Sequence, residues 1–477
     1  MSHNGDVTDV VVVGGGPGGY EAALVAAQLG ARVTVVDRDG LGGSAVLTDC
    51  VPSKALIAVA QVMAEAGASG SLGVRDREGP VAPGALTVDL AQVNARISVL
   101  AHLQSEDIES RLVRDGVRLL HGRGRLVDHS TVVVVAPDGS ERALDADVVL
   151  LATGARPRVV DDALPDGERI LTWEQLYGLT ELPERLVVVG SGVTGAEFAS
   201  AYAELGCDVV LVSSRDRVLP GEDTDAAGVL EDVFAARGMT VMATSRARAV
   251  RRTDDGVLVT LTDGRTVSGT HCLMAVGSVP NTDDMGLDEV GVRRTEDGFI
   301  EVDRVSRTSV RGIYAAGDCT GVLMLASVAA MQGRIAMWHA LGDAVTPLDV
   351  AVVSSTVFTD PEIATVGATQ RDIDEGRVRA VSVTLPLATN ARAKMLGLEH
   401  GFVKLFARTG TRIVVGGVVV APRASELIHV IAMAVDQRLT VDQLAQTFTI
   451  YPSLSGSIAE AARRLHATGA EGSVLGG

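Results

Sequence analysis

The chain has 477 residues, which at ~150 residues per domain suggests about three domains. It carries 42 Lys and Arg against 60 Asp and Glu, a formal net charge of −18, which argues against non-specific binding to nucleic acids and to anionic membrane surfaces. Hydrophobic residues make up 47% of the chain, aromatic residues only 3%, and glycines number 53, a composition that favours an α/β architecture over an all-β sandwich.

The sequence shows neither a targeting pattern nor a metal-binding pattern. The N-terminus lacks a basic region followed by an apolar run, and no stretch approaches ~18 uninterrupted apolar residues. The cysteines lie far apart and form no CxxC pair, which argues against a zinc ribbon or a disulfide framework. They are Cys50, Cys207, Cys272 and Cys319. We therefore expect a cytoplasmic protein with no membrane insertion and no bound metal.

The first predicted element is a strand that leads into a glycine-rich loop. Residues 10–13 are followed by Gly14-Gly15-Gly16-Pro17-Gly18-Gly19, a helical run at 20–29 and a strand at 32–36 that ends at Asp37. The first glycine of such a GxGxxG loop makes a sharp turn, the second lets the backbone approach a pyrophosphate, and the third lets the helix pack on the sheet. The helix N-terminus then holds the phosphates.

The same unit occurs a second time along the chain. Residues 186–189 lead into Gly190-Ser191-Gly192-Val193-Thr194-Gly195, followed by a helix at 196–205 and a strand at 208–212. A lone GxGxxG can be no more than a tight loop, but two copies in the strand–helix–strand frame predict two dinucleotide-binding folds, and hence two dinucleotides.

The remaining segments differ from these two units. A strand-rich stretch at 119–135 and a hairpin signal at Pro137-Asp138-Gly139-Ser140 close off the first unit. Beyond about residue 350 the chain has Thr-, Val- and Ile-rich strands at 352–358 and 414–420, together with two helical stretches. This tail predicts an α+β domain and not a third nucleotide fold.

Taken together, the ordered motifs resemble those of the flavoprotein pyridine-nucleotide disulfide oxidoreductases, which include dihydrolipoamide dehydrogenase and glutathione reductase. The resemblance covers nearly the whole chain and implies an α/β fold with two Rossmann-like dinucleotide-binding domains, for FAD and NAD(P), plus a C-terminal α+β dimerisation domain. It implies that the chain forms a homodimer. The implied boundaries are 1–155 for the first part of the FAD domain, 156–281 for the NAD(P) domain, 282–347 for the segment completing the FAD domain, and 348–477 for the dimerisation domain.

The resemblance assigns FAD contacts to both parts of the FAD domain. Asp37 would bind the adenosine ribose hydroxyls, with an exposed strand-end Asp as the plain alternative. Asp318, in Gly317-Asp318, would hold a ribityl hydroxyl. The other implied FAD-binding residues are Gly14, Gly16, Gly19, Gly43, Ser44, Lys54, Gly124, Thr153 and Gly154.

A Lys and a Glu match the residues that meet beside the flavin in this family. Lys54, in Pro52-Ser53-Lys54, would lie near flavin N5, and Glu197 would pair with it beside the nicotinamide. A cation at that place favours the charge that builds on a flavin accepting hydride. Without the match, both residues would be taken for ordinary surface-helix residues.

Two departures from the family pattern bear on the chemistry. The disulfide reductases carry Cys-x4-Cys just before the PSK sequence, whereas here the flavin-proximal position is Cys50 and its partner is Ala45. A disulfide relay needs both an attacking and a resolving thiol, so the relay is predicted to be absent. Cys50 is then either a reactive thiol or a space-filling relic, and the neighbouring Asp49 favours the relic.

The second departure is near the C-terminus, where the family's acid–base His and its Glu are supplied across the dimer. Tyr451 stands at the His position and Gly456 at the Glu position. A Tyr with its usual pKa of ~10 cannot exchange a thiol proton near neutral pH. The exchanging Cys, the His and the Glu of one catalytic unit are thus all missing. We therefore interpret the site as rebuilt for another acceptor, with Tyr451 lining the acceptor pocket.

The nicotinamide side also departs from the NAD-using members. Ser213 stands where those members place an acid for the ribose 2′-hydroxyl, and Arg215 or Arg217 could hold a 2′-phosphate, so NADP(H) is expected in preference to NAD(H). A solvated basic turn is the alternative. The family's Gly-Arg-x-Pro-Asn becomes Gly277-Ser278-Val279-Pro280-Asn281. The implied nucleotide contacts are Gly190, Gly192, Gly195, Ser213, Arg215 and Gly277.

These features predict an FAD-dependent oxidoreductase that passes electrons from NAD(P)H to a quinone or similar small acceptor without a redox disulfide. The acceptor class comes from resemblance to the actinobacterial NAD(P)H:quinone reductases once labelled lipoamide dehydrogenases. The alternatives are a soluble pyridine-nucleotide transhydrogenase, a single-cysteine peroxidase or oxidase using Cys50, and a non-catalytic flavoprotein scaffold. Lys54 and Glu197 argue against the scaffold.

Overall fold

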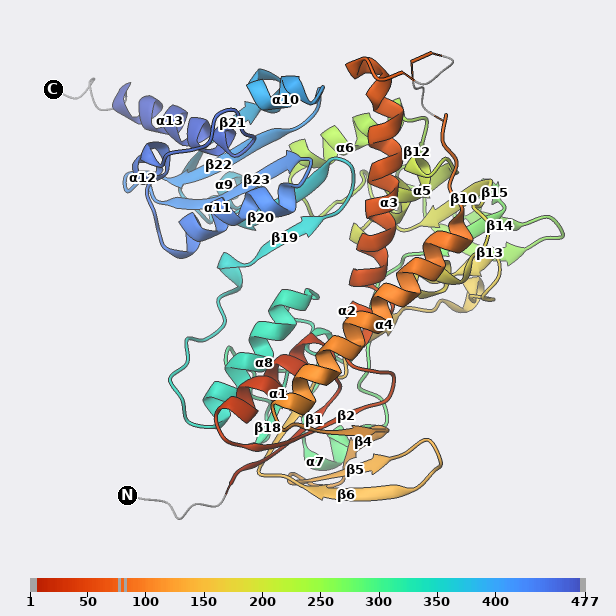
Figure 1. Ribbon diagram of the computed structural model, residues 1–477, viewed down its shortest axis with the longest axis vertical. Helices are drawn as coiled ribbons and strands as arrows, with labels where there is room; N and C mark the ends of the chain where they lie inside the picture. The colour runs from red at the N-terminus through yellow and green to blue at the C-terminus, as the bar shows by residue number, and fades with distance from the viewer. Residues whose placement is uncertain (1–6, 76–78, 81–83, 472–477) are drawn as a thin grey trace.

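The computed structural model describes residues 7–75, 79–80 and 84–471. In this part of the chain there are three five-stranded sheets (Figure 1), and a three-stranded antiparallel sheet packs against one face of each of two of them. Two of the large sheets are parallel and the third is antiparallel. The predicted α/β class, with two dinucleotide-type folds and an α+β tail, is confirmed.

The first parallel sheet has the strand order β18-β7-β1-β2-β3. The central strand β1 pairs with β2 on one side and β7 on the other, so the loop after β1 opens at a switch point, where α/β sheets bind ligands. The members are β1 (Asp9–Val13), β2 (Arg32–Asp37), β3 (Arg118–His121), β7 (Val148–Leu151) and β18 (Ile313–Ala315).

Both faces of this sheet are covered, which explains why β1 is a continuous apolar run. Val10 and Val12 pack in one core with residues of α1 (Pro17–Gln28) and α8 (Ala326–Ala340). Val11 and Val13 pack in another core on the opposite face, which includes the antiparallel sheet β4-β5-β6. The members of that small sheet are β4 (Arg123–Leu126), β5 (Thr131–Val135) and β6 (Glu141–Asp145).

The second parallel sheet repeats this arrangement, with the strand order β12-β11-β10-β16-β9. Its members are β9 (Ile170–Leu171), β10 (Arg185–Val189), β11 (Asp208–Val212), β12 (Thr240–Met242) and β16 (His271–Met274). A three-stranded antiparallel sheet accompanies it, formed by β13 (Ala247–Arg252), β14 (Val257–Leu261) and β15 (Thr266–Gly269). Its helices are α5 (Val193–Glu204) and α6 (Thr224–Ala236).

The C-terminal domain is built on an antiparallel sheet with the order β19-β20-β23-β22-β21. The strands are β19 (Ser354–Val357), β20 (Glu362–Gly367), β21 (Ala380–Pro386), β22 (Phe402–Arg408) and β23 (Val414–Ala421). Its larger helices are α11 (Ala424–Asp436), α12 (Val441–Gln446) and α13 (Gly456–Glu471), of which α13 was not anticipated from the sequence. The exact domain boundaries given above remain predictions.

The other elements connect these sheets. Helices α3 (Cys50–Ala68) and α4 (Leu90–Arg114) form a long pair that extends from the first sheet towards the second (Figure 1). Strands β8 (Ala155–Pro157) and β17 (Ser278–Pro280) pair antiparallel where the chain crosses between the two parallel sheets. The remaining short elements are α2 (Gly43–Leu47), α7 (Leu287–Val290), α9 (Gln370–Asp374), α10 (Ala391–Met395), η1 (Ser69–Leu72), η2 (Asp161–Ala163), η3 (Trp173–Gly178), η4 (Asp318–Thr320), η5 (Val350–Val352) and η6 (Leu387–Thr389).

One helical stretch, Gly43–Leu72, is long and apolar enough to cross a membrane by length and composition. The core helix of a soluble protein passes the same test, and α3 does pack against α4 and α5. Only 33% of the most apolar window is buried within the chain. The absence of membrane insertion therefore remains a prediction.

Candidate active site

The first glycine loop is shaped by backbone contacts that leave no room for side chains. Gly14 has φ +106°, and a Cβ there would lie 2.2 Å from the carbonyl oxygen of Ala152. A Cβ at Gly19 would lie 1.8 Å from the carbonyl oxygen of Gly14, which explains the close approach of α1 to the sheet. Gly16 is the N-cap of α1 and makes no side-chain cap, so the positive end of the helix is open to a phosphate.

Asp37 holds this loop together through backbone hydrogen bonds. Its carboxylate accepts hydrogen bonds from the backbone N–H groups of Gly15 at 2.6 Å, Asp39 at 2.8 Å and Gly40 at 2.6 Å. An ionised carboxylate has about four lone-pair sites, so it can still accept from ribose hydroxyls. The structural role of Asp37 was not visible in the sequence.

Three further predicted FAD residues lie around the loop. Gly43 has φ +56° and faces Gly16 so closely that a Cβ would lie 2.9 Å from the Gly16 Cα. Ser44 follows Gly43 in α2, and Gly124 lies on β4, where a Cβ would meet Val13 at 3.0 Å. The structure thus brings these residues to one end of the first sheet.

The crossover between the parallel sheets is clasped by Thr153 and Asn281. Thr153 Oγ1 donates to the Asn281 carbonyl at 2.7 Å, and Asn281 Nδ2 donates to the Thr153 carbonyl at 3.0 Å. The N–H of Asn281 also bonds to the Gly154 carbonyl at 3.0 Å. The two predicted motifs containing Gly154 and Gly277 therefore meet through β8 and β17, a pairing that the sequence did not reveal.

Gly317 and Asp318 return the chain to the first sheet. The Gly317 N–H donates to Gln332 Oε1 at 2.8 Å, and Asp318 begins η4. Burial, helped by the nearby charge of Asp49, raises the pKa of Asp318 to about 6. At neutral pH Asp318 is still mostly ionised and can accept a hydroxyl hydrogen bond.

Lys54 and Glu197 form the predicted pair across the two dinucleotide folds. Lys54 Nζ lies 2.8 Å from Glu197 Oε2, and the Glu197 side chain is only 4% exposed. Burial alone would lower the pKa of Lys54, but the charge and hydrogen bond of Glu197 outweigh it, so the pKa is raised and the ammonium stays charged. The Phe358 N–H fixes the other carboxylate oxygen at 2.8 Å, a contact that the sequence did not reveal.

The cysteine region contains one sulfur beside this pair. Ala45 lies in α2, Cys50 starts α3, and all four cysteines of the chain are free thiols. Burial, with the negative charge of Asp49, raises the pKa of the Cys50 thiol to about 11. Since the thiol stays protonated at neutral pH, the geometry favours the relic interpretation of Cys50.

The second glycine loop reproduces the first. Cβ atoms at Gly190 and Gly195 would lie 2.1 Å from the Ala275 oxygen and 1.9 Å from the Gly190 oxygen. A Cβ at Gly192, the N-cap of α5, would meet nothing within 4 Å, so open space lies beside the start of the helix. Both loops therefore present helix N-termini without a side-chain cap, which fits a pyrophosphate at each.

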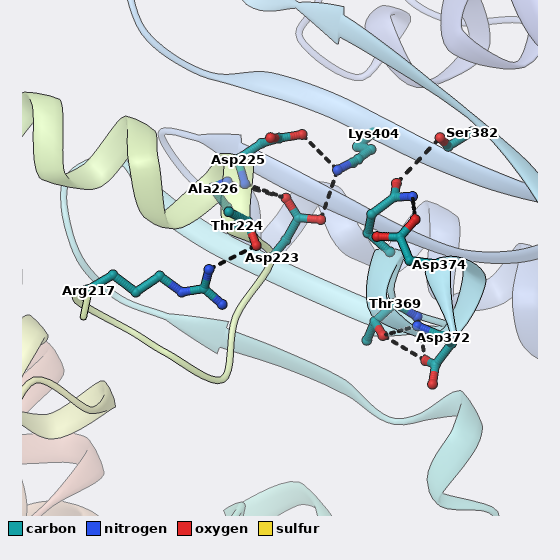
Figure 2. Close-up of polar contacts among 11 residues, drawn as sticks. Arg217, Asp223, Thr224, Asp225, Ala226, Thr369, Asp372, Asp374, Ser382 and Lys404 are labelled. Carbon is teal, nitrogen blue, oxygen red and sulfur yellow. Dashed lines mark hydrogen bonds and ion pairs between the residues drawn. The ribbon is translucent and has the colours of Figure 1, made fainter. Parts of the chain in front are cut away.

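The turn after β11 separates the three residues predicted to bind the nucleotide's ribose. Ser213 is fully buried, and its Oγ lies 2.7 Å from Ser191 Oγ. Arg217 points inward, donating from Nη1 to Thr224 Oγ1 at 3.0 Å (Figure 2). Arg215 is exposed. Of the two candidate arginines, Arg215 is thus the one available to an incoming phosphate.

A buried cation ties this fold to the C-terminal sheet. Lys404 on β22 lies 2.9 Å from Asp223 and 2.8 Å from Asp225, at the start of α6 (Figure 2). The side chains of Lys404 and Asp223 are 5% and 3% exposed. Asp223 also caps α6 by accepting from the N–H groups of Asp225 and Ala226. Lys404 belongs to no recognisable motif, so sequence reasoning missed it.

Tyr451 is not brought to Lys54 and Glu197 within one chain. It is 85% exposed and lies between α12 and α13, which are distant from β1 and α1 in Figure 1. Phe448 and Ile450 beside it are 103% and 80% exposed. A role for Tyr451 at a flavin site therefore depends on a second copy of the chain.

Comparison with known proteins agrees with this geometry. The family model described as pyridine nucleotide-disulphide oxidoreductase matches residues 8–333, and the model of that family's dimerisation domain matches residues 353–462. A protein of Mycobacterium tuberculosis strain H37Rv named NAD(P)H dehydrogenase (quinone) is 56% identical over 470 residues, 97% of this chain and 94% of that one. Dihydrolipoyl dehydrogenase of Geobacillus stearothermophilus is 32% identical over 458 residues, 95% of each chain.

Solved structures show the same fold. The crystal structure of LpdA from M. tuberculosis has a TM-score of 0.91 at 56% identity and covers 96% of this chain and 100% of that one. The flavoprotein disulfide reductase RclA of Escherichia coli, at 22% identity, has a TM-score of 0.84 over 95% of this chain and 99% of its own, which shows likeness of fold alone. The chain therefore belongs to the pyridine nucleotide-disulphide oxidoreductase family and is an oxidoreductase of the flavoprotein type, with FAD and NAD(P) as the cofactors that this family implies.

Proposed function

We propose that this protein passes electrons from NAD(P)H to a quinone or a similar small acceptor without a redox-active disulfide. The observation that carries the proposal is an intact Lys54–Glu197 pair next to a cysteine region in which Ala45 replaces the exchanging thiol. The name of the M. tuberculosis relative, NAD(P)H dehydrogenase (quinone), supports the acceptor class.

Bound FAD would supply the redox chemistry, accepting a hydride from NAD(P)H and releasing electrons to the acceptor. The chain's own residues bind and orient. The helix N-termini at Gly16 and Gly192 hold the two pyrophosphates, and Asp37 and Asp318 accept from sugar-type hydroxyls. Lys54, kept charged by Glu197, stabilises negative charge that develops beside it.

NADP(H) is the proposed preferred nucleotide. Ser213 brings no negative charge to the end of β11, and the exposed Arg215 can pair with a 2′-phosphate. This preference for NADP(H) does not depend on which acceptor the enzyme reduces.

We also propose that the working unit is a cytoplasmic homodimer. The dimerisation-domain match and the exposed side chains of Phe448, Ile450 and Tyr451 support a second copy covering that segment. In such a dimer Tyr451 would reach the partner's acceptor pocket, in place of the His that the disulfide reductases use there.

The proposal is tested by following NADPH and NADH oxidation with a soluble quinone, with lipoamide and with glutathione disulfide in parallel. We expect sustained turnover with the quinone only, and unchanged quinone turnover in Cys50→Ser. Sustained disulfide turnover would contradict the proposal, and so would the failure of either nucleotide to bleach the bound flavin. Hydride exchange between NADPH and NAD⁺ that outpaces quinone reduction would identify a transhydrogenase instead.

A further inference from the structure

The Lys54–Glu197 pair is held in place by a segment of the C-terminal domain. This segment runs from Phe358 to Asp360, between β19 and β20. The Phe358 N–H donates to Glu197 Oε1 at 2.8 Å, and its ring lies against Lys54, with Nζ 4.8 Å from the ring centroid. Asp360, two residues on, donates its N–H to Ser200 Oγ at 3.2 Å. All three domains thus meet at the predicted hydride-transfer pair.

The contacts continue along one face of α5. Glu197, Ser200 and Glu204 are spaced so that their side chains share that face. Ser200 Oγ donates to Glu204 Oε1 at 2.8 Å. Arg237, at the end of α6, bonds to Glu204 at 2.8 Å and also to the carboxylate of Asp360. We call Ser200, Glu204, Arg237 and Asp360 the interdomain cluster.

This cluster has two carboxylates for one guanidinium. The Glu204 side chain is only 3% exposed. Its burial, together with the negative charge of Asp360, raises the pKa of Glu204 to about 7, although Arg237 acts in the opposite direction. Asp360 comes from the C-terminal domain, whereas Arg237 belongs to the same fold as Glu204. Contact between the domains is therefore what brings the second negative charge close to Glu204.

The other charged groups around α5 are engaged elsewhere. On α3, Lys54 faces Glu197. On β10 and β11, Arg185 and Asp208 pair with each other at exposed strand ends. In the C-terminal domain, the carboxylate of Glu362 accepts from the Ser425 N–H. Arg237 and Asp360 are thus the charges that decide the state of Glu204.

We propose that the interdomain cluster is a positioning device for hydride transfer, in which protonation of Glu204 tightens the contact that holds Glu197 and ionisation of Glu204 loosens it. The inference rests on the proposed function, because it assumes that Lys54 and Glu197 act beside the nicotinamide. With Glu204 neutral, Arg237 and Asp360 balance each other across the interface. With Glu204 charged, two carboxylates share one guanidinium and repel, which weakens the hold on residues 358–360.

The sign of the pH dependence follows from linkage. The folded pKa of Glu204 lies above its unfolded value of ~4.3, so its contribution to stability is fully present below that value and is lost as the pH rises through about 7. The same ionisation loosens the segment. The wild-type rate of flavin reduction by NADPH should therefore fall about threefold between about pH 6 and about pH 8, which is the low end of what one ordinary hydrogen bond contributes.

The test compares the FAD-loaded wild type with Glu204→Gln, a neutral side chain of the same shape. Stopped-flow flavin reduction by NADPH is measured across that pH range, together with hydrogen exchange at the amides of Phe358 and Asp360, corrected for intrinsic rates. We expect protection of both amides to drop with rising pH in the wild type and to stay high in E204Q, whose rate should also stay flat. Asp208→Asn, at an exposed pair in the same fold, should keep the wild-type profile.

A second variant tests the hydrogen bond to Asp360 without changing the charge of Glu204. Ser200→Ala removes the acceptor for the Asp360 N–H, so protection at Asp360 should be low at every pH. The inference is overturned if E204Q titrates as the wild type does, or if wild-type protection at residues 358–360 does not change with pH. Failure of NADPH to reduce the wild-type flavin would refute the proposed function instead, while hydrogen exchange would still test the cluster.

Discussion

The loops after β1 and β10 turn in the same way, because a Cβ at Gly14 or at Gly190 would strike a backbone carbonyl at 2.2 or 2.1 Å. They differ at the end of the next strand. There Asp37 accepts three backbone N–H groups, whereas Ser213 is buried against Ser191. On the proposed assignment, the shared turn would bind what all dinucleotides share, the pyrophosphate, and the strand-end residue would distinguish one nucleotide from the other.

The two folds also differ in how they are anchored. The first is packed by α1 and α8, which belong to the same fold. The second is tied to the C-terminal domain by charge, through Lys404 with Asp223 and through the cluster around Glu204. An apolar core joins the same two parts, since Leu230 and Phe234 of the second fold share a cluster with Phe406 of the C-terminal sheet. The second fold is therefore held against the C-terminal domain by ion pairs as well as by apolar packing.

The largest expected effect comes from the third glycine of each loop. Gly19→Ala places a Cβ 1.8 Å from the Gly14 oxygen, where two stretches of backbone would have to move apart, so a destabilisation of about 3 kcal/mol and loss of FAD are expected. Gly195→Ala should keep FAD but lose reduction by NADPH. Flavin absorbance per chain and thermal unfolding measure both effects.

The matched control for these glycine variants is Gly228→Ala in α6. A Cβ there meets nothing within 4 Å, and an alanine in a helix is favoured by up to ~1 kcal/mol, so stability should hold or rise. If G19A bound FAD with wild-type stoichiometry, the first loop would have room for a side chain that the structure does not show.

Loss of the buried anchor should come next. Lys404→Met leaves Asp223 buried without its cation, which should cost about 3 kcal/mol in unfolding free energy, because removing one partner of a buried pair leaves an uncompensated charge. Denaturant unfolding gives the value. Arg185→Met, at an exposed pair, should change stability by less than ~1 kcal/mol. Equal costs for the two variants would contradict the claim that the buried Lys404 pair stabilises the protein more than an exposed pair does.

The charge of Glu197 should affect the activation free energy of flavin reduction about as much as Lys404 affects the free energy of unfolding. Glu197→Gln keeps the shape but removes the counter-charge of Lys54, so flavin reduction by NADPH should slow about 100-fold while FAD stays bound. Stopped-flow spectroscopy measures the rate. Asp232→Asn, at an exposed position on α6, serves as the control and should react at the wild-type rate.

The smallest effect should be on nucleotide choice. Arg215→Gln removes an exposed cation, so the KM for NADPH should rise about tenfold while that for NADH hardly changes. Arg217→Gln disturbs an inward-facing side chain and should affect both nucleotides alike. Steady-state kinetics of the two variants with NADPH and with NADH show which arginine binds the 2′-phosphate. An equal rise of the KM for NADPH and for NADH in R215Q would contradict a role of Arg215 in nucleotide choice.

Much of the site could be predicted because its parts are local. The glycine loops depend on backbone geometry that only glycine tolerates, Glu197 closely follows the second loop, and Lys54 stands in the short motif Pro52-Ser53-Lys54. Their pairing at 2.8 Å is what the family pattern led us to expect. The loss of the disulfide relay could also be predicted, because Ala45 carries no sulfur and the sequence alone shows this.

The rest could not be predicted because it depends on contacts between distant segments. Phe358 acts through its backbone N–H, 161 positions from Glu197, and no side-chain pattern marks a backbone donor. Asn281 lay in a recognised run, but its clasp with Thr153 appears only when β8 and β17 pair. Tyr451 shows the same limit, because its expected neighbours are in another copy of the chain.

The central claim is that electrons leave this flavoprotein without passing through a protein disulfide. An anaerobic titration of the FAD-loaded protein with NADPH, followed by addition of a quinone, tests it most directly. The account predicts that a single equivalent of NADPH per FAD bleaches the flavin completely and that the quinone restores its spectrum, whereas lipoamide does not. Uptake of a second equivalent per FAD before bleaching is complete, or reoxidation by lipoamide, would contradict it.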